Sequence, residues 1–417
     1  MSLSNVYKKY KVVFKNFSFL SILQFVQLAV TFFTYPYLIK TLGQENYGII
    51  AYSQAIVGYF TIIINYGFNA TATKEIAHNR ENKVVISEIV NAVFFAKFYL
   101  FVASLIIFLI LVFNVSFLSQ HKWIYILTFF TTLGWVAFPD WYFQGIEKMQ
   151  NMTYAMVISR VLSVIIIFLF IKKHTHYIYV PIINSLSMII AGAIGVLLVV
   201  KSNNKIHFYI PKFTLVKEQY KKGFAYFTSN LTANTKDYLN TILIGAFLNY
   251  YSVAIYDLVN KIIKVLILPC SILGNAIFPT VTLKKSLSFN VRVGRIMLYY
   301  SLLVCSFLFL IPYEAWSYLI KVDLEQFKYT LHILSFSLPL LTMTISKGFL
   351  TLVGFNEDKY FTKGILLSIM GYFIFIGFLI LFKAFNLYTA AFAINASLIL
   401  EIIIYKKRIT YLKKKTK

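Results

Sequence analysis

The sequence predicts an all-α protein that crosses a membrane many times. Of its 417 residues, 59% are hydrophobic and only 13% are charged, and the mean hydropathy is +0.72. A soluble protein of this size would carry roughly a quarter charged residues. The net charge of +25 could suggest nucleic-acid binding, but the basic residues gather in short loops between apolar runs, as in membrane proteins. We therefore exclude nucleic acid as a partner.

Twelve apolar stretches are long enough to cross a bilayer, which needs about 20 residues per helix. They cover residues 17–39, 47–67, 89–114, 122–141, 152–171, 177–200, 224–247, 252–278, 293–312, 327–352, 361–382 and 386–405. The first is too long to be the apolar core of a signal peptide, so we expect it to be a membrane helix. The seventh is unusually polar.

The distribution of basic residues predicts the orientation. With twelve spans, 27 of the 40 Lys and Arg residues lie on the side that holds both termini, 7 lie on the opposite side, and 6 lie within the spans. Basic loops stay in the cytoplasm. We therefore expect a multi-pass protein with both termini in the cytoplasm.

The longest loop, residues 201–223, falls near the middle of the chain. It predicts an N-terminal six-helix lobe (1–200), a basic cytoplasmic loop between the lobes (201–223) and a C-terminal six-helix lobe with a basic tail (224–417). No loop is long enough for a soluble catalytic domain, and no catalytic residues are assigned.

Two pairs of segments suggest an internal repeat. Residues 47–52 and 251–256 both begin and end with tyrosine. Gly-Ile-Glu-Lys at 145–148 follows the fourth predicted span, and Gly-Phe-Asn-Glu at 354–357 follows the tenth. Secondary transporters are often built from such repeats, with the binding site between them.

Six basic side chains lie at membrane depth. They are Lys97, Arg160, Lys236, Lys261, Lys264 and Lys347. A charge in hydrocarbon is costly unless it faces a partner or a wet cavity. These residues predict a central cationic cavity between the lobes, and hence an anionic cargo. Lys347 is near enough to the membrane edge to snorkel, and snorkelling is also open for Lys97 and Arg160.

Polar residues form faces on three predicted helices, because they recur every three or four positions. The first helix carries Gln24, Gln27 and Thr31, the seventh carries Asn230, Asn234, Asp237 and Thr241, and the eighth carries Asp257, Lys261 and Lys264. Such residues either hydrogen-bond between helices or line a cavity. We favour a cavity for the seventh and eighth helices.

Asp237 and Asp257 lie close to lysines in the sequence, and Asp257 is one helical turn from Lys261. Two interpretations stay open: the aspartates exchange a proton or Na⁺ during transport, or they form static ion pairs. Cys270 and Cys305 do not form a disulfide framework, and no spacing suggests a metal or another cofactor.

Three segments carry a resemblance to a known family: LGQENYG at 42–48, GFNATATKEIA at 67–77 with Arg80, and PDWYFQGIEKM at 139–149. With them, the chain resembles the Wzx-type O-antigen and polysaccharide flippases of the MOP exporter superfamily, whose fold is also that of MATE transporters. The motifs themselves look structural. The resemblance implies two six-helix lobes around a central cavity, a bacterial inner-membrane location and a rocking cycle.

The resemblance also implies the cargo, an undecaprenyl-diphosphate-linked oligosaccharide flipped from the inner to the outer leaflet. The cavity cations Lys236, Lys261, Lys264, Arg160 and Lys97 would meet the diphosphate. The polar residues of the first and seventh helices, with Tyr52 and Tyr59, would meet sugar hydroxyls. Membrane lipids surround the protein, and a polysaccharide polymerase and a chain-length regulator are expected partners.

Three other functions fit the sequence less well. An ion-coupled drug exporter of the MATE type is the main alternative, but cationic drugs favour an acidic cavity. A membrane glycan polymerase or ligase would need a large outer loop. A flippase for the peptidoglycan precursor tends to have more than twelve helices. The predicted protein is therefore a transporter and not an enzyme.

Overall fold

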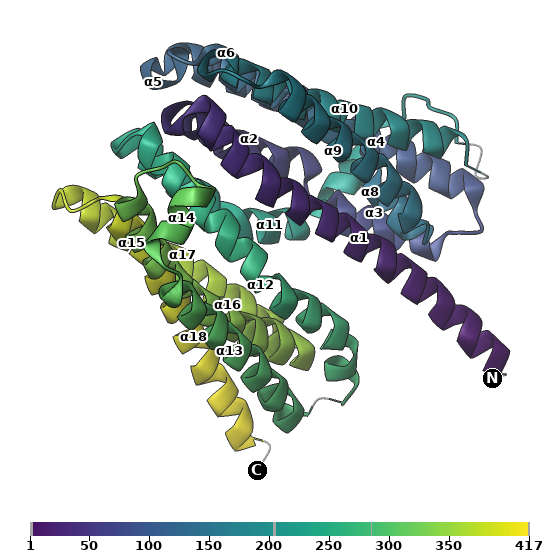
Figure 1. The fold of residues 1–417 in the computed structure, drawn as a ribbon. Coiled ribbons are helices and arrows are strands. Elements are labelled where there is room, and N and C mark those ends of the chain that lie inside the picture. The colour runs from purple at the N-terminus through teal and green to yellow at the C-terminus, as the bar shows by residue number, and fades with distance from the viewer. Residues whose placement is uncertain (1–2, 203–205, 285, 416–417) are drawn as a thin grey trace. The chain divides into compact units, whose positions relative to one another are not determined.

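The computed structural model describes residues 3–202, 206–284 and 286–415, and helices are the only regular secondary structure in those ranges (Figure 1). The prediction of an all-α polytopic membrane protein is confirmed. The chain divides into two compact units, residues 1–231 and 232–417. The division into lobes at 201–223 stays a prediction.

The first unit begins with a long helix and contains several short ones. Its elements are α1 (Leu3–Leu42), α2 (Gln44–Asn65), α3 (Phe68–His78), α4 (Lys83–Asn114), α5 (Ser116–Ser119), α6 (Lys122–Phe129), α7 (Thr131–Ala137), α8 (Asp140–Gly145), α9 (Met149–Phe170), the 3₁₀ helix η1 (His174–Ile178) and α10 (Tyr179–Val200). Helix α11 (Phe213–Phe247) begins in this unit and ends in the second.

The second unit also contains both long and short helices. Its elements are α12 (Tyr250–Lys284), α13 (Leu287–Leu310), α14 (Tyr313–Leu319), α15 (Leu324–Ser335), α16 (Ser337–Thr344), the π-helix η2 (Ile345–Leu352), the 3₁₀ helix η3 (Val353–Phe355), α17 (Asp358–Leu381) and α18 (Leu387–Lys415). Helix α18 packs against α15, α16, α17 and η2 (Figure 1).

Ten helical segments of the described residues are long and apolar enough to cross a membrane. The other two predicted spans are also helical. Residues 122–141 are broken at Phe130 and at 138–139, so that α6 and α7 are each short. Residues 224–247 lie in α11, whose polar side chains lower its hydropathy below that of a typical span.

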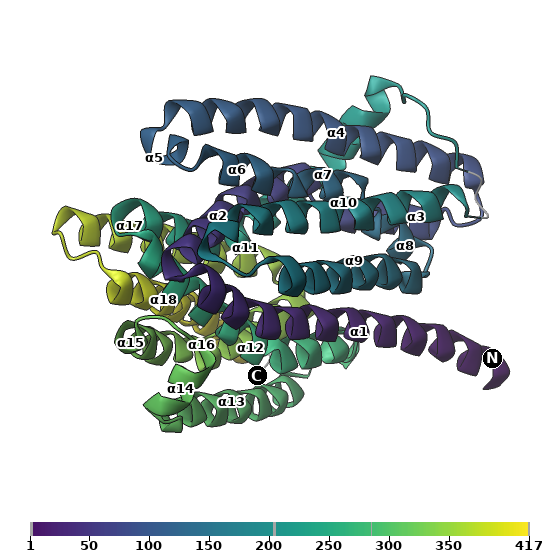
Figure 2. The same ribbon diagram turned by 45° about the horizontal axis from the view of Figure 1, so that its top comes forward.

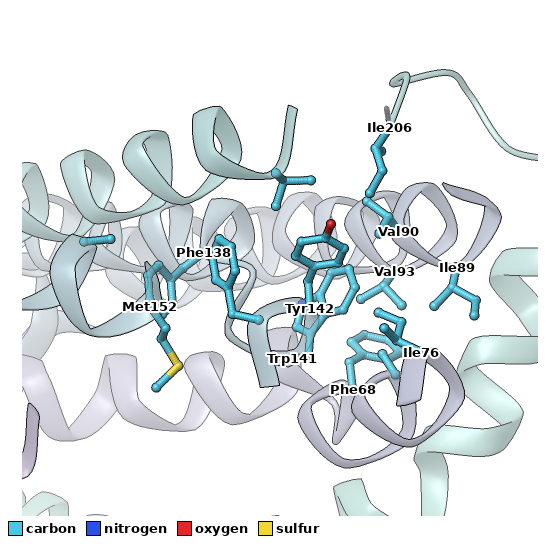
Figure 3. Packing of buried hydrophobic residues seen from close by; sticks show 14 of the residues in the cluster. Phe68, Ile76, Ile89, Val90, Val93, Phe138, Trp141, Tyr142, Met152 and Ile206 are labelled. Carbon is cyan, nitrogen blue, oxygen red and sulfur yellow. The ribbon is translucent and has the colours of Figure 1, made fainter. Parts of the chain in front are cut away.

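The core of the first unit is built around the segment that follows α7. Trp141, Tyr142 and Phe143 are fully buried, and Figure 3 shows Trp141 and Tyr142 among apolar side chains of α3 and α4, such as Phe68 and Val93. Helix α10 packs between α7 and α9, and α1 packs on α9, so these helices form successive layers (Figure 2). The core explains why residues 139–149 read as a structural motif.

The two turns that suggested an internal repeat share one backbone conformation. Glu147 and Asn356 occupy the same place in the turns at 145–148 and 354–357, and both are left-handed, with φ of 57° and 63°. In each turn the next residue donates its N–H to the carbonyl five positions back, at 2.9 Å and 2.8 Å. The same conformation and hydrogen bond also end α17, where Lys383 has a φ of 55° and Ala384 donates to the Leu379 carbonyl at 2.8 Å. This is a common way for a helix to end, so the internal repeat stays a prediction.

Helices α7 and α10 approach each other closely at Gly134 on α7. A Cβ at this position would overlap the backbone of Met188 on α10, whereas a Cβ at Gly377 on α17 would meet nothing within 4 Å. We expect Gly134→Ala to lower the thermal midpoint of the detergent-solubilised protein, since overpacking costs about 1–3 kcal/mol. Gly377→Ala is the matched control and should melt at or above the parent's midpoint, because alanine favours helix. Equal losses in both variants would contradict this packing.

Candidate functional site

The candidate site of the second unit lies on α11 and α12, where two lysines meet two aspartates. Lys261 and Asp257 are one turn apart on α12, and Lys261 Nζ lies 2.5 Å from Asp257 Oδ2. Lys264 Nζ reaches across to Asp237 Oδ2 on α11, at 2.8 Å. Four predicted site residues are thus brought together as two ion pairs.

The two pairs differ in their access to the surroundings. The side chains of Lys264 and Asp237 are 54% and 35% exposed, whereas those of Lys261 and Asp257 are 19% and 17% exposed. More of the Lys264–Asp237 pair is therefore open to a group from outside the protein. The Lys264–Asp237 pair is therefore the most accessible paired charge of the predicted site.

Lys236 belongs to a separate, buried network. Its ammonium lies 3.3 Å from Glu401 Oε2 on α18 and donates to Ser368 Oγ on α17 at 3.2 Å. Glu401 also accepts hydrogen bonds from Ser368 and from the Tyr405 hydroxyl, at 3.2 Å and 3.0 Å. With side chains only 10% and 9% exposed, Lys236 and Glu401 join α11 to α18 inside the second unit.

Glu401 is the functional candidate that sequence reasoning missed. It lies in the last predicted span, 386–405, where a carboxylate is as unusual as a lysine. The polar faces predicted from the sequence include Asp237 and Asp257 but not Glu401. An acid in an otherwise apolar span was the available signal, and Lys236 was the partner to seek.

Asn240 lies beside the polar face predicted for the seventh span, residues 224–247. It is fully buried on α11, where its amide donates to the Ala390 carbonyl at 3.1 Å and its Oδ1 accepts from Tyr372 at 2.8 Å. These bonds tie α11 to α17 and α18 within the second unit.

Lys97 and Arg160 lie in the first unit. Lys97 is fully buried on α4, so it does not snorkel, and its Nζ donates to the Trp135 carbonyl at 3.1 Å. The Asp140 carboxylate attracts this ammonium and accepts a hydrogen bond from Asn69 Nδ2 at 2.6 Å. Lys97 thus belongs to the buried core around α8.

Arg160 lies half-buried on α9. The Tyr35 hydroxyl of α1 interacts with its guanidinium electrostatically. In the described part of the chain, Arg160 forms no ion pair with a carboxylate, unlike the three lysines of the second unit.

The predicted polar faces are only partly available to a ligand. On α1, Gln24 and Gln27 are exposed, and the half-buried Thr31 donates its hydroxyl to the Gln27 carbonyl at 2.8 Å. On α11, Asn230 is exposed and Asn234 is half-buried.

Two of the hydroxyl-bearing side chains point to structural roles. Thr241 is buried and donates its hydroxyl to the Asp237 carbonyl at 3.2 Å. Tyr52 is also buried, against the rings of Phe117 and Tyr125. The expectation that Tyr52 meets sugar is therefore wrong, because its ring packs inside the first unit.

The segments that carry the family resemblance hold α3 against α8. Asn69 bonds to Asp140, Thr73 donates to the Trp141 carbonyl at 3.1 Å, and Arg80 Nε donates to the Gly145 carbonyl at 2.8 Å. These contacts give the motifs a packing role, since each joins 67–80 to 139–147.

Comparison with known proteins identifies the family. The profile of the polysaccharide biosynthesis protein family matches residues 13–283. The chain belongs to this family. Two relatives from Escherichia coli K12 and Shigella dysenteriae share the name "Putative O-antigen transporter". The Escherichia coli protein is 30% identical to this chain, over 70% of this chain and 69% of its own length. The Shigella dysenteriae protein is 25% identical, over 64% of this chain and 66% of its own length.

Solved structures of MATE transporters share the fold of this family member. An inward-facing multidrug resistance MATE transporter of the MOP superfamily matches with a TM-score of 0.71 and 15% identity, over 96% of this chain and 99% of that one. A MATE structure in the straight conformation matches with a TM-score of 0.59 and 15% identity, over 95% of this chain and 94% of that one. With its family and its apolar helices, the chain is a membrane transporter and not an enzyme.

The Lys236–Glu401 pair can be tested by a double-mutant cycle. We expect Lys236→Met to lower the thermal midpoint strongly, because removing one partner of a buried pair costs about 3–5 kcal/mol. The double variant with Glu401→Gln should recover much of the loss, since no uncompensated charge remains. Thermal unfolding of detergent-purified protein measures all four members of the cycle. A double variant that loses the sum of both single losses would contradict the pairing.

Proposed function

We propose that the protein flips an undecaprenyl-diphosphate-linked oligosaccharide from the inner to the outer leaflet of the bacterial inner membrane. The family match and the O-antigen transporters among its relatives support this substrate class. The observation that carries the proposal is the accessible lysine–aspartate cluster on α11 and α12. A diphosphate is the part of such a cargo that cannot enter hydrocarbon without compensating charges.

In this proposal the diphosphate competes with the aspartates for their lysines. Lys264 would bind the diphosphate first, because its side chain is 54% exposed. Lys261 lies one turn away on the same helix. Lysine is a mobile point charge, suited to a site that must both bind and release phosphate. Arg160 would add a third cation from the first unit, while Lys236 and Lys97 would act through the packing that they stabilise.

The same exchange provides a route to ion coupling. When phosphate takes the lysine, Asp237 or Asp257 loses its counter-ion. A carboxylate left unpaired in a partly buried place binds a proton or Na⁺ to avoid the cost of an isolated charge. Uptake of the cation and of the substrate would then be linked.

Sugar hydroxyls would be met by the exposed and half-buried amides Gln24, Gln27, Asn230 and Asn234 and by the half-buried Thr31. The buried Thr241 would support this face from within α11. We propose an alternating-access cycle in which two lobes, joined by 201–223, open a central cationic cavity to each side in turn. Both termini would be cytoplasmic, given the excess of basic residues on that side. A polysaccharide polymerase and a chain-length regulator would receive the product.

An ion-coupled exporter of small molecules is the second candidate, and the MATE-like fold favours it. In that case Asp237 and Asp257 would bind the cationic drug in place of their lysines. A flippase would need the lysines of these ion pairs to bind its substrate, whereas a drug exporter would need the aspartates. Substitutions that neutralise one or the other therefore distinguish the two candidate functions.

Proteoliposomes test the main proposal. They would contain the purified protein and a fluorescent undecaprenyl-diphosphate oligosaccharide, and the rate at which the label crosses the bilayer would be measured. We expect Lys264→Gln to lower this rate roughly tenfold, because the variant loses about one hydrogen bond between a charged side chain and the diphosphate. Lys321→Gln, at an exposed lysine between α14 and α15, should leave it unchanged. Efflux of a cationic dye by the same vesicles, without movement of the glycolipid, would overturn the proposal in favour of drug export.

Ion coupling has its own test in the same vesicles. Translocation by the parent protein should rise when a proton or Na⁺ gradient is imposed. Asp237→Asn and Asp257→Asn should lose this response while keeping basal translocation, because the amide cannot bind the cation by charge. A full gradient response in both variants would show that the aspartates are static partners of the lysines.

A further inference from the structure

A basic pocket lies within the second unit, away from the lysine–aspartate cluster. It has a volume of about 270 Å³ and is lined by residues of α13, α16, η2 and α18, among them Arg295, Lys347 and Lys406. Arg295 follows the segment 279–292 on α13, Lys406 begins the segment 406–417 on α18, and Lys347 lies just before the segment 353–360. These are segments for which the charge distribution predicts the cytoplasm.

The pocket concentrates positive charge without acids. No Asp or Glu occurs among its described lining residues, and Lys347 and Lys406 repel each other electrostatically. The nearby Arg408, in contrast, is neutralised by Glu357 at 2.8 Å and does not line the pocket. Three like charges around a small hollow are unfavourable unless an anion enters.

The backbone and the polar groups of the pocket suit a compact anion. Lys347 and Ser346 belong to the π-helix η2, where the Thr351 hydroxyl donates to the Ser346 carbonyl five residues back, at 2.8 Å. Segments of π-helix are rare and are frequent at functional sites. Asn290 also lines the pocket. It is 1% exposed, and its Oδ1 accepts no hydrogen bond in the described part of the chain.

From this geometry we infer that the pocket binds a phosphate group, with the phosphodiester of an anionic membrane lipid as its natural source. Arg295, Lys347 and Lys406 would surround the phosphate. A headgroup hydroxyl, such as that of a glycerol, would donate to Asn290 Oδ1. Basic pockets between membrane helices at the cytoplasmic surface are suited to such headgroups. The site goes beyond the proposed transport function and does not depend on it.

Lipid binding to the purified full-length protein tests the inference. Native mass spectrometry would compare phosphatidylglycerol with phosphatidylcholine across a concentration series. We expect selective binding of phosphatidylglycerol, weakened roughly tenfold or more in the Arg295→Gln, Lys347→Gln, Lys406→Gln triple variant. The control triple variant is Arg292→Gln, Lys359→Gln, Lys407→Gln. It removes the same charge from exposed neighbours outside the pocket and should bind as the parent does.

Several outcomes decide the inference. Equal weakening in both triple variants, or equal binding of both lipids, would overturn it, because general surface charge would then explain the binding. Thermal stabilisation by inorganic phosphate alone, absent in the pocket variant and kept in the control, would support the pocket with a soluble anion as its ligand. If the pocket triple variant does not fold, Arg295→Gln alone is compared with Arg292→Gln in the same assay.

Discussion

The cost of an uncompensated charge at membrane depth governs the arrangement of the second unit. Desolvation of an ammonium group is offset only by a close partner of opposite charge and by further hydrogen bonds. Lys236, Lys261 and Lys264 each meet a carboxylate within 3.3 Å. The helices that supply those carboxylates must therefore pack where the lysines can reach them, and α11, α12 and α18 are held together partly by this requirement.

The pairs divide into buried structural contacts and accessible ones. Glu401 has three hydrogen-bonding neighbours, so opening its contact with Lys236 would leave several polar groups unsatisfied. The side chains of the Lys264–Asp237 pair are 54% and 35% exposed, so a group from outside the protein can reach this pair more easily than the buried one. A transporter needs both kinds of contact, since a bundle must stay intact while a site within it binds and releases its cargo.

The turns at Glu147 and Asn356 have the same backbone conformation in two different surroundings. The left-handed residues Glu147 and Asn356 lie at helix ends in the first and second units. In the first unit the side chain of Glu147 pairs with Arg80 at 2.9 Å, whereas in the second the following residue, Glu357, pairs with Arg408. The backbone geometry is thus shared by two turns whose charged side chains differ by one position.

The sequence by itself determined the fold class, ten of the twelve predicted membrane helices and the contact between Asp257 and Lys261. Each of these depends on local properties: apolar stretches that match the bilayer, and a spacing of four residues that brings side chains together on one helix. The partners of Lys236 and Lys264, the burial of Tyr52 and the basic pocket around Lys347 were decided only by the tertiary structure. They join residues from helices far apart in the chain, and which faces of those helices meet depends on packing that no local pattern records.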